Sequence, residues 1–243
     1  MIETTMKKVL STYEDLASEY YDSIRHPTCA NFREGSKHIL RKSFERLPSK
    51  DCWLCEVGAG KSLMAELLVK DNVALDRLII TDSSASMLTH SKQWNNVGAY
   101  ILTADATNLP FASRSLEIVV SSLGDPYNTH GLWKEIFRVL KPGGMFFFTT
   151  PAYEWAVSFR GTNSGEPFTL AEFELLDAKH VWVPSWIYSI DEQLEIIENE
   201  GFLVREVVNV LICDLKNGNL SPKLLSKDGP DKSIVTGYVL AKA

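Results

Sequence analysis

The residues best suited to bind a ligand lie in the segment Glu56-Val-Gly-Ala-Gly-Lys-Ser62. Gly58 and Gly60 allow the backbone to turn tightly and to approach a bound group closely. An apolar run of strand length precedes the segment, and a run of helical period follows it at 63–70. The first N–H groups of a helix have no partner within the helix and attract polar or anionic groups. The pattern is therefore typical of a strand–turn–helix that binds a ligand.

Three classes of ligand are bound by turns of this kind. A P-loop for nucleoside triphosphates needs G-x-x-x-x-G-K-[ST], and here Gly60-Lys61-Ser62 supplies its end. Its first glycine would fall at position 55, which is Cys, so an ATPase is disfavoured. A dinucleotide-binding turn, G-x-G-x-x-G/A, matches at Gly58 and Gly60. Its third position is Leu63, which is too bulky for close helix packing, so a dehydrogenase is disfavoured as well.

Four sequence blocks together point to the third class. They are Glu56–Gly60, Thr81–Leu88, Ala104–Phe111 and Glu135–Gly144. In their order and spacing they resemble the motifs of class I S-adenosylmethionine-dependent methyltransferases, over roughly residues 52–150. One departure is Ser62, where the family usually has a third glycine, near the methionine part of the cofactor. The resemblance implies that the chain binds S-adenosylmethionine and transfers its methyl group.

The resemblance also assigns cofactor roles to side chains at the ends of three strands. Glu56 would face the cofactor's ammonium group, and Asp82 would accept hydrogen bonds from both ribose hydroxyls. Asp105 would hydrogen-bond the adenine amino group. Alternatively, Asp82 only caps the following helix, and Met87 packs in the core instead of against the adenine. The other predicted cofactor residues are Gly58, Ala59, Gly60, Ser83, Met87, Ala106 and Ser122.

The predicted acceptor side follows the fourth strand. Asp125-Pro126-Tyr127 resembles the Asp/Asn-Pro-Pro-Tyr motif of amino-methyltransferases with one proline missing, and a simple Asp-Pro turn is an equal alternative. Histidine is the residue type whose charge changes near neutral pH, so His130 is the predicted base, with Asp125 orienting the nucleophile. The alternative for His130 is a polar residue in the first turn of a helix. Tyr20-Tyr21-Asp22 resembles the N-terminal segment whose tyrosine covers the cofactor as a lid in many small-molecule methyltransferases, which makes Tyr21 the predicted lid. Plain packing of the front helix is an equal alternative.

These residues need a scaffold, and apolar runs alternate with segments of helical period along the chain. The runs are apolar at nearly every position, which is typical of parallel strands covered by helices on both faces. The runs are 53–57, 78–81, 100–103, 116–121 and 145–149, and the helical segments are 63–70, 85–94 and 132–140. The alternation predicts an α/β fold with a doubly wound sheet. The resemblance implies a Rossmann-like sheet of seven strands with an antiparallel last strand.

The flanking segments complete the predicted organisation. Apolar residues at helical spacing from Val9 to Ile24 predict one amphipathic helix. After an irregular stretch at 152–188, a capping box at Ser189 and Glu192 starts a helix to about Asn199. Two strands follow at 202–215 and 234–241.

The predicted units are an N-terminal helical lid or cap at 1–48, the cofactor-binding core at 49–151, a substrate-cap insertion at 152–188, and the C-terminal part of the sheet at 189–243.

The insertion bears on the choice of substrate. Eight aromatic and five acidic residues lie between positions 151 and 188, against two basic ones. An aromatic, acid-rimmed cap suits a small neutral or cationic acceptor, although an ordinary subdomain core with an acidic surface explains it equally. The sequence therefore predicts methylation of a small molecule, at N or O in preference to C. The alternatives are methylation of RNA or protein, or a non-catalytic cofactor-binding subunit.

Composition excludes several broad classes. With 25 basic and 31 acidic side chains, the net charge is −6 and the pI is about 5.4, which disfavours a dedicated nucleic-acid binder. No window approaches the roughly 18 apolar residues of a membrane span, so we expect a soluble, cytoplasmic protein. The four cysteines are too few for a disulfide framework, and no metal is predicted because no Cys/His grouping has ligand spacing. The oligomeric state is not indicated.

Overall fold

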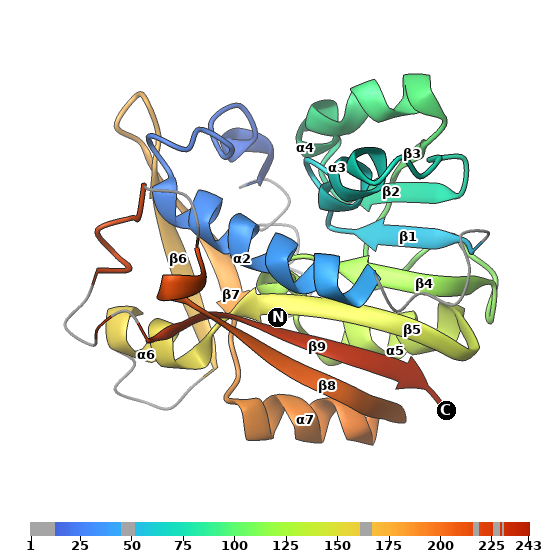
Figure 1. The fold of residues 1–243 in the computed structure, drawn as a ribbon. Helices are drawn as coiled ribbons and strands as arrows, with labels where there is room; N and C mark the ends of the chain where they lie inside the picture. The colour runs from blue at the N-terminus through green and yellow to red at the C-terminus, as the bar shows by residue number, and fades with distance from the viewer. Residues whose placement is uncertain (1–12, 45–51, 161–166, 216–218, 226–228, 230) are drawn as a thin grey trace.

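A seven-stranded mixed sheet organises the residues that the computed structural model describes, which are 13–44, 52–160, 167–215, 219–225, 229 and 231–243. Its strands lie in the order β3-β2-β1-β4-β5-β9-β8 (Figure 1). The bounds are β1 Leu54–Val57, β2 Leu78–Asp82, β3 Tyr100–Thr103, β4 Leu116–Ser121, β5 Leu140–Pro151, β8 Phe202–Leu211 and β9 Ser233–Lys242. A separate hairpin pairs β6 (Phe168–Glu174) with β7 (His180–Trp186).

The pairing of the strands confirms the predicted fold. Strands β1 to β5 pair in parallel, and the last strand, β9, runs antiparallel between β5 and β8. Ala241 of β9 lies opposite both Met145 of β5 and Leu203 of β8. The strand order reverses at β1, which lies between β2 and β4. In open α/β sheets, ligands bind beyond the carboxyl ends of the strands at such a reversal.

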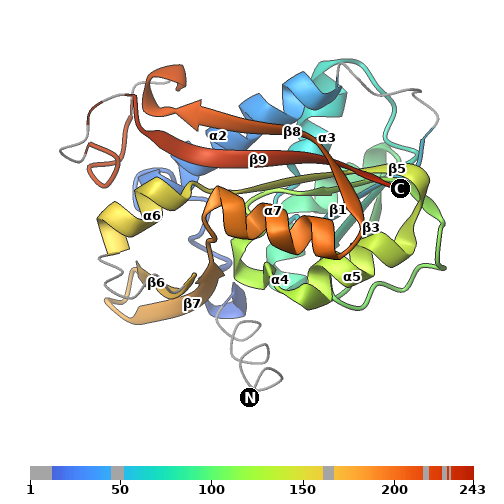
Figure 2. The same ribbon diagram turned by 90° about the horizontal axis from the view of Figure 1, so that it is seen from below.

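Helices cover both faces of this sheet. They are α2 Pro27–Phe44, α3 Leu63–Lys70, α4 Ala85–Leu88, α5 His130–Val139, α6 Tyr153–Arg160 and α7 Ile190–Asn199, with 3₁₀ helices η1 Thr89–Val97, η2 Asp125–Tyr127 and η3 Ile212–Asp214. Ile118 and Val120 of β4 pack in one core with residues of α2 and α3. Val119, between them, packs with α5 and α7 on the opposite face (Figures 1 and 2). Burial on both faces explains the continuous apolar runs of β1, β2, β4 and β5. The edge strand β3 is apolar as well but largely exposed.

The front segment departs from the single helix expected from Val9 to Ile24. Positions 9–12 lie outside the described residues, and the helix of the described part ends at residue 16. Turns follow, in which the Asp22 carboxylate accepts from the N–H groups of Ile24 and Arg25 at 2.9 and 3.2 Å. Ile24 is 89% exposed. The expectation of one helix is wrong here, because turns replace the helix directly after Leu16, where the N–H groups of Glu19 and Tyr20 both donate to the Leu16 carbonyl. The Asp22 turn then redirects the chain, and Pro27 starts α2 at a position that suits proline.

The stretch 152–188, expected to be irregular, contains α6 and the β6–β7 hairpin. Pro184 lies inside β7, and a proline within a run weakens the sequence signal for a strand. Val181 of β7 packs in one cluster with Leu16 and Tyr20 of the front segment. The hairpin therefore supports the front segment beside the sheet.

Two further predicted helices can be compared with the structure. The capping box at Ser189 and Glu192 is formed and starts α7. The helix expected at 85–94 is instead the short α4 followed by η1, which ends at Gly98 in a left-handed conformation.

No helix in the described part of the chain has the length and apolar character to span a membrane. Over the same residues, no three His, Cys, Asp or Glu side chains gather as they would around a metal ion.

Candidate functional site

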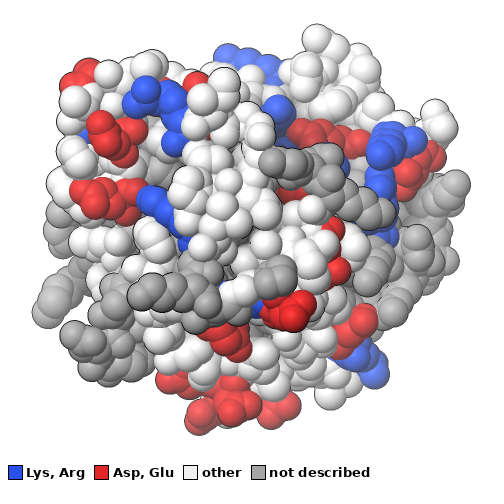
Figure 3. All heavy atoms as spheres, turned by 60° about the vertical axis from the view of Figure 1, so that its left-hand side comes forward, with Lys and Arg blue, Asp and Glu red and all other residues white. Residues whose placement is uncertain are grey.

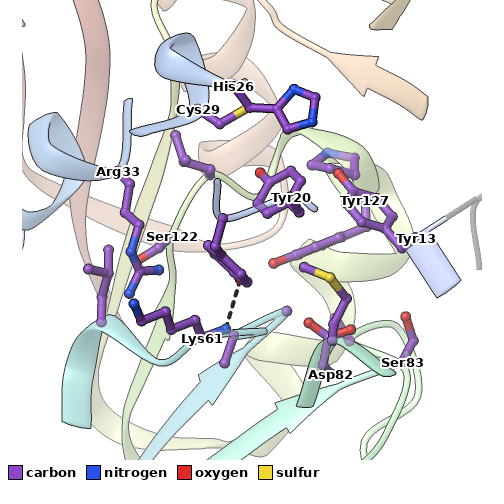
Figure 4. Close-up of a pocket in the computed structure, with 18 of the residues that line it drawn as sticks. Tyr13, Tyr20, His26, Cys29, Arg33, Lys61, Asp82, Ser83, Ser122 and Tyr127 are labelled. Carbon is purple, nitrogen blue, oxygen red and sulfur yellow. Dashed lines mark hydrogen bonds between the residues drawn. The ribbon is translucent and has the colours of Figure 1, made fainter. Parts of the chain in front are cut away.

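A pocket lies where the strand order reverses, between the carboxyl ends of the central strands and the front segment with α2 (Figure 4). Many of the predicted cofactor residues line it. They are Gly58, Ala59, Asp82, Ser83, Met87, Asp105, Ala106 and Ser122. Tyr21, the predicted lid, lines the pocket as well. The structure thus brings together residues of four strand ends and of the N-terminal segment.

The glycine turn after β1 accepts only glycine at two positions. Gly58 and Gly60 have φ values of +60° and +46°, in the left-handed region that disfavours other residues. A Cβ at Gly58 would lie 1.9 Å from the hydroxyl of Tyr127, and one at Gly60 would lie 2.2 Å from the hydroxyl of Tyr21. The Tyr21 hydroxyl accepts from the Lys61 N–H at 2.7 Å, drawn as the dashed line in Figure 4. Two tyrosines therefore hold the turn on its pocket side.

Glu56 takes a place different from the predicted one. Its carboxylate is fully buried and is not part of the pocket lining. It accepts from the Ser62 hydroxyl and from the N–H groups of Leu63 and Met64, the first of these at 3.1 Å. Ser62 stands where the family has glycine, and its hydroxyl draws the carboxylate to the N-terminus of α3. The predicted contact of Glu56 with a cofactor ammonium group is therefore not supported.

Burial makes Glu56 a source of pH-dependent stability. Burial raises its pKa to about 7 from 4.5, against the hydrogen bonds from Ser62 and the α3 backbone. The folded state therefore holds this proton more tightly than the unfolded chain, and stability is lost as the pH rises from about 4.5 through 7. At 1.36 kcal/mol per unit, the loss is about 3 kcal/mol.

We expect Glu56→Gln to remove this part of the pH dependence. Urea unfolding from pH 5 to pH 8 should show a flatter decline in the free energy of unfolding than in the wild type. Glu198→Gln, at an exposed position of α7, is the matched control and should keep the wild-type slope. Equal slopes for Glu56→Gln and the wild type would contradict the assignment.

Asp82 joins the end of β2 to the glycine turn. Its carboxylate accepts from the Gly60 N–H and from the Ser84 N–H, both at 2.9 Å. The side chain is 8% exposed, and burial raises its pKa to about 6. The N-cap of α4 is Ser84, whose hydroxyl accepts from the Met87 N–H at 3.1 Å. Asp82 is thus not the cap residue, and its carboxylate lines the pocket.

Two further polar groups face the pocket beyond β3 and β4. One oxygen of Asp105 accepts from both the N–H and the hydroxyl of Thr107 at 2.8 Å, which fixes the carboxylate at the end of β3. The hydroxyl of Ser122 is buried and has no hydrogen-bond partner in the described part of the chain. A buried hydroxyl without a partner is costly unless a ligand or water satisfies it. This position is therefore suited to bind a polar ligand atom.

The N-terminal segment supplies the opposite wall of the pocket. Tyr20 packs edge-on against Tyr13 and Tyr21, with ring centroids 6.0 and 4.9 Å apart. The Arg33 guanidinium lies 5.3 Å from the centre of the Tyr21 ring and 2.9 Å from the Glu66 carboxylate. Sequence reasoning missed His26, Cys29 and Arg33 because they belong to no local motif. It also missed Lys61, whose place in the glycine turn was a usable signal.

The predicted base does not reach the pocket. His130 is the first residue of α5, and its side chain is 78% exposed with Nδ1 3.4 Å from the Glu200 carboxylate. Asp125 is buried and accepts from the Ser185 hydroxyl of β7, so it ties η2 to the hairpin. Neither side chain is part of the pocket lining, although Pro126 and Tyr127 are. The predicted trio of His130, Asp125 and Tyr21 is therefore not assembled.

The pocket has a charge polarity. Arg33 and Lys61 lie at one side and Asp82 at another, as Figure 4 shows, with Asp105 also in the lining. The nearby Lys37 shares Glu66 with Arg33, at 3.3 Å, but does not line the pocket. The arrangement suits an elongated ligand that carries a negative group at one end and hydroxyl donors toward the other.

Comparisons with known proteins agree with this geometry. Residues 55–148 match the family described as a methyltransferase domain. The mitochondrial arginine-hydroxylase NDUFAF5 of Danio rerio is 38% identical over 93 residues, which are 37% of this chain and 28% of that protein. A malonyl-[acyl-carrier protein] O-methyltransferase of Marinomonas sp. (strain MWYL1) is 29% identical over 153 residues, 59% of this chain and 52% of that protein. The matched part spans about half or less of these relatives.

The fold is shared with solved structures over almost the whole chain. One is a chain from the complex of the Trm112 methyltransferase activator with a methyltransferase from Haloferax volcanii. It has a TM-score of 0.67 at 18% identity, and the alignment covers 96% of each chain. At this identity the likeness shows the fold alone. Other solved chains with the same fold are described as S-adenosylmethionine-dependent methyltransferases.

Proposed function

We propose that this protein transfers a methyl group to a small-molecule acceptor, since the chain belongs to the class I S-adenosylmethionine-dependent methyltransferase family. One observation carries the proposal: the glycine turn, Asp82 and Asp105 share a single pocket with a second wall supplied by the front segment. S-adenosylmethionine supplies an electrophilic methyl group on a sulfonium. The protein's contribution to such a displacement is mainly to align the nucleophile with that methyl group and to exclude water.

The residues of the pocket fit this cofactor. We assign the ribose hydroxyls to Asp82 and the adenine edge to Asp105 with the Ala106 N–H, while Met87 packs against the base. The unpartnered Ser122 hydroxyl offers a hydrogen bond on the same side. The predicted core at 49–151 would thus supply the cofactor side of the pocket, and the N-terminal segment would supply the opposite wall. The insertion at 152–188 would support that wall through the β6–β7 hairpin, and residues 189–243 would complete the sheet. Tyr21 covers the turn as the lid.

We assign the cofactor's carboxylate to Arg33 and Lys61, the cations beside the glycine turn. Arg33→Met should then weaken binding of S-adenosylhomocysteine about tenfold, because one charge-assisted hydrogen bond contributes about 1.5 kcal/mol or more. Binding of 5′-methylthioadenosine, which has no carboxylate, should be unchanged. Calorimetry with both ligands distinguishes the carboxylate contact from a general disturbance of the pocket.

Lys37→Met is the control for this experiment, since Lys37 also pairs with Glu66 but does not line the pocket. It should bind both ligands as the wild type does. Parallel weakening of both ligands by Arg33→Met would count against the carboxylate assignment.

The proposal favours a small acceptor, methylated at oxygen or nitrogen. On the face in Figure 3, the described Lys and Arg atoms are scattered among Asp and Glu atoms, and acidic atoms gather along its lower edge. A nucleic-acid substrate would favour a continuous basic face. A protein or RNA substrate is the second candidate, and one similar protein is named a malonyl-[acyl-carrier protein] O-methyltransferase.

Labelled methyl transfer tests the function directly. The protein and deuteromethyl-labelled S-adenosylmethionine are incubated with cell extract separated into small-molecule, protein and RNA fractions, and each is analysed by mass spectrometry. We expect label in the small-molecule fraction. Label confined to protein or RNA would establish the second candidate, and binding of the cofactor without any labelled product would leave a non-catalytic subunit.

A further inference from the structure

We propose that His26 is the proton acceptor of the site and that the acceptor substrate is a neutral molecule with a hydroxyl group, which is methylated on oxygen. This inference rests on the proposed methyl transfer. His26 lines the pocket, and its Nε2 atom is buried and has no hydrogen-bond partner in the described part of the chain. The residue is 9% exposed.

The backbone holds His26 firmly in this place. Its N–H donates to the Asp22 carbonyl at 2.8 Å, and its carbonyl accepts from the Ala30 N–H at 3.2 Å in the first turn of α2. Its ring packs edge-on against Phe173 of the hairpin, at 5.4 Å between centres. A buried imidazole nitrogen without a partner is costly, so its retention at a pocket wall points to a ligand. Figure 4 shows His26 and Cys29 across the pocket from Asp82 and Ser83.

The surroundings of His26 keep its ring neutral. Burial lowers the pKa of His26, and the charge of Arg25 acts in the same direction. Glu19 and Asp22 oppose this effect from the front segment, and Lys223 adds to it from the C-terminal loop. The N-terminus of α2 also disfavours a positive charge. The ring can therefore accept a proton near neutral pH, with Nε2 as the accepting atom and the resident proton on Nδ1.

The wall around His26 suits an uncharged substrate. Burial raises the pKa of the Cys29 thiol to about 12 and the pKa values of Tyr13 and Tyr20 above their ordinary range, so all three groups are neutral. The charge of Asp125 raises these three pKa values further, but its carboxylate accepts from the Ser185 hydroxyl and is not part of the pocket lining. Among the described lining residues, this wall therefore offers no carboxylate to a protonated amine. The cations Arg33 and Lys61 are assigned to the cofactor's carboxylate, and the described pocket lining holds no other Lys or Arg for an acidic substrate.

The reaction balances with these residues alone. A lone pair of the substrate oxygen forms the new bond to the methyl carbon, and the carbon–sulfur bond breaks with its electron pair staying on sulfur. The hydroxyl proton passes to Nε2 of His26, and the imidazolium later releases it to water. The products are a methyl ether and S-adenosylhomocysteine.

The first experiment observes His26 without turnover. The ring nitrogens are followed by NMR in the complex with S-adenosylhomocysteine while phenol, aniline or benzoate is added. Before addition we expect the ring in its Nδ1–H form. Phenol should then shift the His26 resonances at a concentration at least tenfold lower than aniline or benzoate requires. No response to phenol, or an equal response to the other two, would overturn the choice of substrate class.

The second experiment uses the labelling assay. His26→Gln should lower the initial rate of label transfer by about 10²- to 10⁴-fold, the usual contribution of a general base, with the affinity for S-adenosylhomocysteine within twofold of the wild type. The wild-type rate should rise with pH through one ionisation below the ordinary histidine range, and His26→Gln should lose this step. His130→Gln, at an exposed position outside the pocket, should behave as the wild type.

The outcomes separate the two proposals. If the wild type transfers label and His26→Gln does so equally fast, or if the product carries the label on nitrogen, the assignment of His26 fails while methyl transfer stands. If the wild type binds S-adenosylhomocysteine but transfers no label, methyl transfer itself fails. His26→Asn is a second variant, which should lose the same rate while keeping the melting temperature of the wild type. This combination shows that the loss of rate does not reflect unfolding.

Discussion

Replacing Asp82 with alanine should weaken the binding of S-adenosylhomocysteine at least tenfold. Hydrogen bonds to a charged group contribute about 1.5 to 3 kcal/mol each, and one such bond already corresponds to a factor of ten or more. The carboxylate is held toward the pocket by the N–H groups of Gly60 and Ser84, so it meets the ribose without further ordering. Calorimetry measures the change directly.

The same variant should also weaken 5′-methylthioadenosine, which keeps the ribose hydroxyls. Arg33→Met, in contrast, should leave the binding of 5′-methylthioadenosine unchanged, so the pair of variants assigns the two ends of the cofactor. Asp76→Ala, at an exposed position just before β2, is the control and should leave both affinities unchanged. An unaltered affinity in Asp82→Ala would refute the ribose contact and leave Asp82 with a structural role in the turn.

Gly58→Ala should lower the free energy of unfolding by about 2 to 5 kcal/mol and abolish tight cofactor binding. The left-handed backbone costs about 1–2 kcal/mol for a residue with a Cβ, and overpacking costs about 1–3 kcal/mol more. The second contribution arises because the new Cβ would lie 1.9 Å from the Tyr127 hydroxyl. Urea unfolding and calorimetry measure the two effects.

Gly143 offers a matched control for the backbone part of this cost. Its φ is +75°, and a Cβ there would meet no atom within 4 Å. Gly143→Ala should therefore show the conformational cost alone and bind the cofactor normally. A double-mutant cycle with Tyr127→Ala should recover the steric part at Gly58. Equal losses of stability in Gly58→Ala and Gly143→Ala would show that the Tyr127 side chain moves aside from the new Cβ without lowering the free energy of unfolding.

The sheet and the cofactor side of the pocket could be predicted from sequence because their signals are local. Each parallel strand carries its own apolar run. Gly58 directly follows β1, Asp82 is the last residue of β2, and Asp105 lies shortly after β3. The carboxyl ends of parallel strands meet at one edge, so their order along the chain already places these residues together. The prediction for Glu56 differs from the structure, because the hydroxyl of Ser62, only six residues away, donates to its carboxylate and holds it at the N-terminus of α3.

The acceptor side depends on contacts between distant segments, which no local pattern encodes. The apolar spacing to Ile24 predicts a helix, but the helix ends at residue 16. The turn at Asp22 then brings His26 to the pocket just before α2. His130 has suitable chemistry, yet the start of α5 turns it toward Glu200 and solvent.

The sequence by itself determined the α/β sheet, the glycine turn and the carboxylates at the strand ends, because each depends on residues close together in the chain. Only the tertiary structure decided that Arg33 and His26 complete the pocket and that His130 does not. Side chains on α2 reach the site because the whole helix packs across the sheet, and that packing is set by the shape and burial of the assembled core.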